Sequence, residues 1–317
     1  MVDKKKMYVT EEEGKALSFP YDWHQTWHHP FEMNRVVNEA QTIKAFVADG
    51  DERQMGLEVL KLLLDYTFAT RDQLVRLLSI KGLDNGDRLD ALLQKYQDRR
   101  LINKFAISAF EMDHIPDDAF VVYCLDHASR HILSHMYRDD VAVTWKSTNA
   151  VRGPELVAKY LATNEFYLSL LAAKTQSLAY FEPTVNFTIR SRDIRVSAIF
   201  RIMNGATPCD FVLEVVRASD IPSNWRKKTN EQLAPFVLDK FWNRYFQIEP
   251  IFIFLAEDLQ QAKELAEIYY LRTESNNFRV TTDSELCNGI DKAKFYKYEP
   301  NSPEKLVVSS AKIFQKD

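Results

Sequence analysis

The sequence is poor in several features that define specialised classes of protein. Its 317 residues include three cysteines, Cys124, Cys209 and Cys287, which lie far apart and form no C-x-x-C pair. This spacing excludes a disulfide framework and a thiolate zinc site, and it indicates a reducing, cytoplasmic environment. Eight glycines and 11 prolines are too few for a collagen-like or low-complexity chain. No stretch approaches the roughly 20 apolar residues that span a bilayer, so we expect no membrane association.

An excess of basic charge is also missing. The chain has 41 Lys and Arg against 45 Asp and Glu, a net charge of −4, and its pI is near 6.0. A protein that coats nucleic acid is expected to be strongly basic, so any contact with DNA must come from local clusters of charge. Residues 1–13 contain three consecutive lysines with no apolar stretch behind them, a pattern that does not predict a secretory signal.

The chain does contain three regions of different pattern. Residues 1–50 are aromatic and polar and predict an N-terminal arm packed on another part of the protein. Residues 51–138 predict compact helices followed by a hairpin. After a polar connection at 139–152, residues 151–317 predict an α/β domain with a mixed sheet. The expected fold class is therefore α+β, with two folded domains after the arm.

The second region follows a recognisable order of elements. Apolar residues at three- and four-residue spacing predict a first helix over residues 55–66. Thr70 stands three residues before Gln73, a pattern that predicts a capping box at the start of a second short helix. A turn containing glycine is expected at 81–87, and a third helix at 87–100. Two β-prone runs, at 101–110 and 119–125, are expected to pair as a hairpin. This order predicts a winged helix-turn-helix.

The third helix of this region carries the prediction of DNA binding. Arg88, Lys95 and Arg99 fall within about 40° of one another at 100° per residue. From Arg71 to Lys104 there are eight Lys and Arg against five Asp and Glu. A helix with such a basic line can enter the major groove and meet phosphates and guanine edges. The alternative is a small helical core with a solvated charged face. The predicted DNA-binding residues are Arg71, Arg76, Lys81, Asn85, Arg88, Lys95, Arg99, Arg100 and Lys104.

The third region predicts a sheet followed by alternating helices and strands. Gly153-Pro154 opens a long helix that the apolar pattern carries to about Lys174. Strand-like runs follow at 178–181, 185–190, 194–203 and 210–216. One helix is expected from about Trp225 to Phe246. The almost wholly apolar run at 250–256 is typical of a strand buried on both faces. A helix at 257–270 and a strand at 278–282 complete the region.

Five segments of the chain carry a resemblance to a known family. They are GDRLDALL at 86–93, RLINKF at 100–105, VYCL at 122–125, ASR at 128–130 and KYLATNEF at 159–166. Together they resemble the bacterial plasmid replication-relaxation family, over about residues 56–282. The resemblance implies an N-terminal winged helix that binds double-stranded DNA and an α/β half resembling a restriction-endonuclease-like core. It also implies an accessory role in replication initiation or conjugative transfer, in the relaxosome, at an origin of a plasmid or mobile element.

The nuclease chemistry of such a core is interrupted in this sequence. A metal-dependent nuclease of this type needs an Asp on one strand and, on the next, an acidic residue two positions before a Lys. The carboxylates hold Mg²⁺ and the Lys steadies transition-state charge. Here Ser197 stands where the family pattern has the Asp, and Val216 stands two positions after Glu214.

Catalytic side chains could be supplied in this half from positions other than those of the family pattern. Asp193 or Asp210 is a candidate carboxylate, and Arg217, Lys227 or Lys228 a candidate cation. We expect an inactive, nuclease-like half without a metal or other cofactor; the alternative is a Mg²⁺-dependent endonuclease with a rearranged site around Glu214. The vestigial catalytic candidates are Asp193, Asp210, Glu214 and Arg217.

Two further clusters carry weaker signals. Residues 185–230 contain eight Lys and Arg against four acids, which predicts either a second DNA-contacting surface or a solvated face. Strand alternation places Arg195 and Arg201 on one face of it. His24 and His28 are four residues apart, a spacing that metals use, and His29 follows. Because two tryptophans flank these histidines and no third ligand is near, we interpret them as aromatic packing of the arm and predict no metal.

The winged helix has a second possible use. It can dock a protein partner, such as a relaxase, a replication initiator or a helicase, in place of DNA, and this use agrees with the acidic net charge. A homodimer is also possible. A two-fold dimer bound to DNA would predict two half-sites about one helical turn apart.

Overall fold

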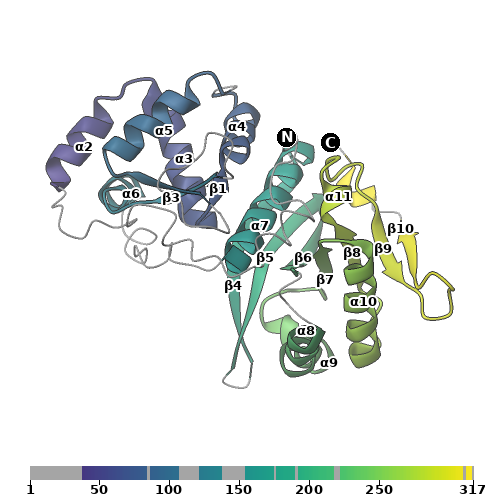
Figure 1. Cartoon of the computed structure of the whole chain (residues 1–317). Coiled ribbons are helices and arrows are strands. Elements are labelled where there is room, and N and C mark those ends of the chain that lie inside the picture. Colours follow the sequence, from purple (N-terminus) through teal and green to yellow (C-terminus); the bar gives the residue numbers. More distant parts are fainter. Residues whose placement is uncertain are drawn as a thin grey trace. The chain divides into compact units, whose positions relative to one another are not determined.

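A computed structural model describes residues 38–83, 86–106, 121–137, 154–174, 176–189, 192–217, 222–309 and 312–315. The chain divides into two compact units between Asn164 and Glu165 (Figure 1). Helix α7 (Pro154–Ala173) contributes residues to both. Residues 1–37, which include the histidine cluster, and the polar connection at 139–152 lie outside the described residues.

The N-terminal unit combines helices with a small sheet. Its three strands lie in the order β1-β3-β2, and both pairings are antiparallel. The described end of the predicted arm is helix α2, which lies against α6 and buries Phe46. The elements are α2 (Glu39–Val47), α3 (Glu52–Tyr66), β1 (Ala69–Thr70), α4 (Arg71–Ile80), α5 (Leu89–Asp98), β2 (Ile102–Ala106), β3 (Val121–Leu125) and α6 (Ser129–Tyr137).

The capping box predicted at the start of α4 is present. Thr70 Oγ1 accepts a hydrogen bond from the Gln73 backbone N–H at 3.2 Å, and Gln73 Oε1 accepts one from the Thr70 N–H at 3.2 Å. The buried Gln73 amide also donates to the Leu161 carbonyl at 2.8 Å, and Asn164 Nδ2 donates to Gln73 Oε1 at 3.1 Å. The cap of α4 therefore also joins this helix to the first part of α7 within the same unit.

Apolar faces of three helices form the core of the N-terminal unit. In α4 and α5 the buried apolar side chains are at the positions that the helical spacing predicts. In α3 two leucines of the apolar spacing, Leu57 and Leu64, are only half-buried, and Val59 and Leu62 are buried instead. Helices α3 and α5 approach each other closely at Gly56 and Tyr96. A Cβ atom at Gly56 would lie 1.7 Å from Tyr96 Oη, so only glycine fits there. The core residues of these helices include Val59, Leu60, Leu63, Leu74, Leu78, Leu89, Leu92 and Leu93.

A seven-stranded mixed sheet organises the C-terminal unit. The sequence predicts a mixed sheet, but it places the last strand at 278–282 and does not predict the two strands at 295–298 and 306–309. The strand order is β10-β9-β8-β7-β6-β5-β4, with parallel pairing of β6 with β7 and of β7 with β8, and antiparallel pairing elsewhere. The strands are β4 (Leu178–Ile189), β5 (Arg192–Asn204), β6 (Thr207–Val215), β7 (Ile251–Ala256), β8 (Phe278–Thr282), β9 (Phe295–Tyr298) and β10 (Leu306–Ser309).

Two further sequence expectations for this unit differ from the structure. The runs at 178–181 and 185–190 belong to one edge strand, β4, because an edge strand tolerates Pro183, which lacks an N–H, and the positive φ of Thr184. The single helix expected over 225–246 is divided by a π-helical turn and ends before the positive φ of Lys240. The helical elements after β6 are α8 (Pro222–Lys228), η2 (Thr229–Leu233), α9 (Ala234–Leu238), η3 (Phe241–Arg244), α10 (Leu259–Thr273), α11 (Asp283–Leu286) and η4 (Lys312–Phe314).

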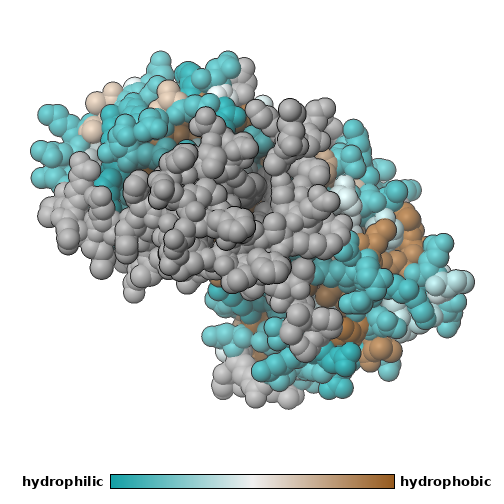
Figure 2. All heavy atoms as spheres, in the orientation of Figure 1, coloured by the Kyte–Doolittle hydropathy of each residue, from teal (hydrophilic) through white to brown (hydrophobic). Residues whose placement is uncertain are grey.

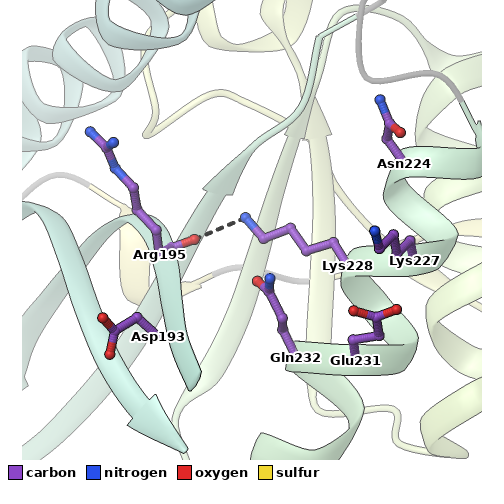
Figure 3. A pocket seen from close by; sticks show the side chains of 7 residues that line it. All are labelled: Asp193, Arg195, Asn224, Lys227, Lys228, Glu231 and Gln232. Atoms are coloured by element: carbon purple, nitrogen blue, oxygen red, sulfur yellow. Dashed lines mark hydrogen bonds between the residues drawn. The ribbon is translucent and has the colours of Figure 1, made fainter. Parts of the chain in front are cut away.

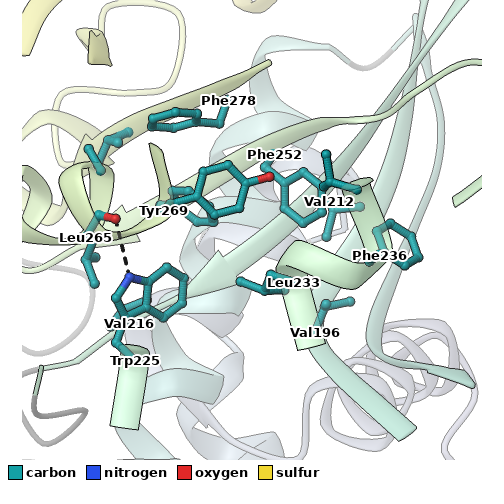
Figure 4. Close-up of a cluster of buried hydrophobic side chains, with 14 of the residues drawn as sticks. Val196, Val212, Val216, Trp225, Leu233, Phe236, Phe252, Leu265, Tyr269 and Phe278 are labelled. Atoms are coloured by element: carbon teal, nitrogen blue, oxygen red, sulfur yellow. Dashed lines mark hydrogen bonds between the residues drawn. The ribbon is translucent and has the colours of Figure 1, made fainter. Parts of the chain in front are cut away.

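A cluster of large apolar side chains joins this sheet to α8, α9 and α10 (Figure 4). In the central strand β7, Phe252 and Phe254 lie on one face and Ile253 and Leu255 on the other, and all four are buried, which confirms the prediction of a strand buried on both faces. The Trp225 indole donates a hydrogen bond to the Leu265 carbonyl at 3.3 Å, so its polar atom is satisfied inside the cluster. This packing fixes α8 against the sheet.

Hydrophilic side chains dominate the visible described face of the N-terminal unit in Figure 2, whereas hydrophobic patches appear on the C-terminal unit. Exposed apolar residues of the C-terminal unit include Ile248, Leu259, Leu271 and Val308. Within the described ranges, no helix combines the length and the apolar character needed to cross a bilayer.

Candidate functional site

Two of the cations predicted to meet DNA are paired inside the N-terminal unit. Lys95 Nζ lies 2.7 Å from Asp49 Oδ1 and 2.8 Å from Glu52 Oε2, and Arg99 Nη1 lies 2.8 Å from Asp49 Oδ2. The Asp49 side chain is 3% exposed, so its charge needs these partners. This pairing runs against the expectation of a basic line along α5 that is open to a groove. Lys95 and Arg99 instead hold the α2–α3 turn against α5.

Two other predicted cations are paired as well. Arg71 makes a bidentate contact with Asp90 at 2.6 and 2.7 Å, and this guanidinium holds the pKa of Asp90 below its ordinary value. Arg100 Nε lies 3.3 Å from Asp126 Oδ2, and both side chains are largely buried. These pairs connect α4 to α5, and the end of α5 to the end of β3.

Exposed predicted cations are found at the turn between α4 and α5. Lys81 follows the last residue of α4, and Arg88 precedes the first residue of α5. Lys81 Nζ is 3.7 Å from Glu58, and Arg88 Nη2 donates to the Leu83 carbonyl at 2.8 Å. Arg76 and Lys104 are half-buried, and Asn85 lies outside the described residues. Lys81 and Arg88 are therefore two exposed predicted cations that flank the turn leading into α5.

In the C-terminal unit the structure brings together Glu214 and one proposed migrated cation. Glu214 lies on β6 and is buried, and Lys228 of α8 donates to its Oε1. The same ammonium donates to the Arg195 carbonyl at 2.9 Å. The other carboxylate oxygen, Glu214 Oε2, is buried and has no hydrogen-bond partner among the residues that the structure describes.

The remaining vestigial candidates do not join Glu214. Asp210 pairs with Arg201 at 2.7 and 2.9 Å, so Arg201 does not share an open basic face with Arg195. The Asp193 carboxylate accepts a hydrogen bond from the Thr188 hydroxyl at 2.9 Å.

Arg217 belongs to a separate buried cluster. Its Nη1 lies 2.5 Å from Asp283 Oδ2 and 4.0 Å from Glu257 Oε1. The three residues follow the carboxyl ends of the neighbouring strands β6, β7 and β8. No pattern in the sequence indicates this cluster, because its members are far apart along the chain.

The residues around Glu214 do not fit a magnesium site. Mg²⁺ requires near-octahedral oxygen ligation, usually with one or two carboxylates from the protein. Glu214 already pairs with Lys228, and at the position of the expected Asp the Ser197 hydroxyl accepts a hydrogen bond from the Val215 N–H at 2.9 Å. No group of three or more His, Cys, Asp or Glu able to hold a metal occurs within the described part of the chain.

An open pocket of about 310 Å³ lies beside the Glu214–Lys228 pair (Figure 3). The charge count over 185–230 indicated a basic surface here, but it did not identify the two amides, which the helical segment after β6 brings to the cations. The pocket is lined by Asp193, Arg195, Asn224, Lys227, Lys228, Glu231 and Gln232.

No family model and no curated protein matches this chain. Among solved structures, it is similar to the restriction endonuclease FokI, with 9% sequence identity and a TM-score of 0.27. The similarity covers 74% of this chain and 43% of that one, so the chain spans less than half the length of that protein. The resemblance to the replication-relaxation family stays a prediction.

Proposed function

We propose that this chain is a DNA-binding accessory protein of a plasmid or mobile element, acting at an origin in replication initiation or conjugative transfer. The proposal assigns a winged helix-turn-helix to the N-terminal unit. It is supported above all by the order α3, α4, α5 and then an antiparallel β2–β3 pair, with β1 beside β3. In such a module the second helix of the helix-turn-helix pair lies in the major groove, which makes α5 the recognition helix.

Arg88 and Lys81 are the contacts that we favour. Recognition helices meet base edges with their N-terminal residues, and these two exposed cations flank the turn that leads into α5. We assign Arg88 to a guanine edge or a phosphate and Lys81 to a phosphate. We do not propose Lys95 and Arg99 as DNA contacts, because they form ion pairs with Asp49 and Glu52.

The experiment is selection of bound fragments from the replicon that carries the gene, followed by affinity measurements on the selected duplex. Arg88→Glu should reduce affinity at least about tenfold, because it removes a contact and introduces repulsion from phosphates. Lys292→Glu, which makes the same charge change at an exposed residue of the C-terminal unit, is the matched control. Equal affinity of the wild type and Arg88→Glu would overturn the proposed mode of binding.

One observation favours a second function, docking of a protein partner by the N-terminal unit. The pairing of Lys95 and Arg99 with acids leaves much of α5 close to neutral, which suits a protein surface better than a row of phosphates. A relaxase, a replication initiator or a helicase is the partner class in question. Binding of such a purified protein in the absence of DNA, with no duplex selected, would favour this function over the first.

A further inference from the structure

The pocket lies in the C-terminal unit between strand β5 and the α8–η2 segment (Figure 3), whereas the residues assigned above to reading DNA belong to the N-terminal unit. All seven of its lining residues are charged or carry an amide. Pockets for ordinary small molecules are lined mainly by apolar and aromatic side chains. The lining here therefore favours a polar, charged ligand.

Lys228 lines this pocket, and two hydrogen bonds hold its side chain in place. Its ammonium donates to Glu214 and, at 2.9 Å, to the Arg195 carbonyl. Because Glu214 is 4% exposed, moving Lys228 away would leave a buried carboxylate without its cation. An ammonium group has three N–H donors, so one remains for a ligand after these two bonds.

The other six lining residues are two cations, two amides and two acids. Lys227 is exposed and forms no ion pair with any residue in the described ranges. Arg195 supplies a guanidinium, while Asn224 and Gln232 supply amide N–H groups. The two acids are Asp193, which accepts a hydrogen bond from the Thr188 hydroxyl outside the lining, and the exposed Glu231.

The π-helical turn η2 helps to build this arrangement. It begins directly after Lys228, and its widened hydrogen bonding is marked by the bond from the Ala234 N–H to the Thr229 carbonyl. Lys227 and Glu231 are four residues apart, as are Lys228 and Gln232, and all four line the pocket. Single π-helical turns within α-helices recur at functional sites.

We infer that this pocket binds a phosphate group, and that its source is the backbone of DNA. Ammonium, guanidinium and amide groups are the donors that phosphate oxygens accept from. An open pocket admits a phosphate that remains part of a continuous strand. The choice of DNA over free phosphate rests on the proposed function.

The test uses the full chain with two probes, inorganic phosphate and a duplex of random sequence. Either probe should perturb the backbone amide NMR signals of residues 224–232. Lys227→Gln should weaken random-duplex binding about three- to tenfold and reduce the salt slope by about one. Lys227→Arg should restore the affinity, and Lys292→Gln, at another exposed lysine, should leave it unchanged.

The outcomes separate this inference from the proposed function. If the duplex binds the wild type and Lys227→Gln equally and leaves the signals of 224–232 unmoved, the pocket assignment is overturned while DNA binding stands. If phosphate shifts those signals and no duplex binds, the pocket is a free-phosphate site and the proposed function fails. If neither probe shifts them, the inference is overturned.

Discussion

The contact between Gly56 and Tyr96 shows how one residue sets the spacing of two helices. Glycine within a helix costs about 1 kcal/mol relative to alanine, so this position carries a penalty that close packing with Tyr96 must offset. No feature of the sequence around Gly56 indicates its partner, which lies 40 residues further along on α5. The reason for this glycine becomes visible only when α3 and α5 are packed.

Gly56→Ala should therefore destabilise the N-terminal unit despite its better helix propensity. The added Cβ would meet Tyr96 Oη at 1.7 Å and Cζ at 2.6 Å, and overpacking of this kind costs about 1–3 kcal/mol or more. Urea unfolding monitored by circular dichroism measures the change. The double variant with Tyr96→Phe should recover part of the loss, because the phenol oxygen is the atom nearest the new Cβ. Unchanged stability of Gly56→Ala would contradict the close approach.

At the scale of elements, local patterns were the predictable part of the fold. The capping box at Thr70 and Gln73 and the apolar strand β7 follow from neighbouring residues, and both are present. The ion pairs of Lys95 with Asp49 and Glu52 join residues more than 40 positions apart, and helical periodicity carries no information on such partners. The basic line on α5 can thus be predicted from the sequence, but the carboxylates that pair with its cations cannot.

Gln73 should matter more to stability than its capping partner Thr70. Loss of an N-cap hydroxyl in Thr70→Ala costs about 1 kcal/mol. Gln73→Ala also removes the bonds to Leu161 and Asn164, and each buried polar group left unsatisfied costs about 1–3 kcal/mol. Thermal and urea unfolding of the two variants should rank Gln73→Ala as clearly the less stable. Equal losses would mean that the tie to α7 contributes little.

At the scale of the whole molecule, the charged groups occupy separate clusters, and this separation bears on catalysis. The vestigial catalytic candidates predicted from the sequence are Asp193, Asp210, Glu214 and Arg217, because the order of strands alone does not show which of these side chains converge. In the structure Glu214 meets Lys228, Asp210 meets Arg201, and Arg217 meets Asp283. We therefore expect no nicking of supercoiled plasmid by the chain across a range of Mg²⁺ and Mn²⁺ concentrations. Cleavage that disappears with EDTA and with Glu214→Ala would contradict this expectation and restore the endonuclease alternative.

The compensation of charge across the molecule also limits how strongly DNA binding can depend on salt. The cations that we assign to phosphates or base edges are Lys81 and Arg88 in one unit and Arg195 and Lys227 in the other. Each neutralised phosphate contributes a slope of about −0.9 to a plot of log affinity against log salt concentration, so the full chain should give about −3 to −4. Anisotropy titrations of a bound duplex at several salt concentrations measure this slope. A value steeper than about −7 would correspond to about eight neutralised phosphates, so cations beyond the four assigned here would have to join the contact.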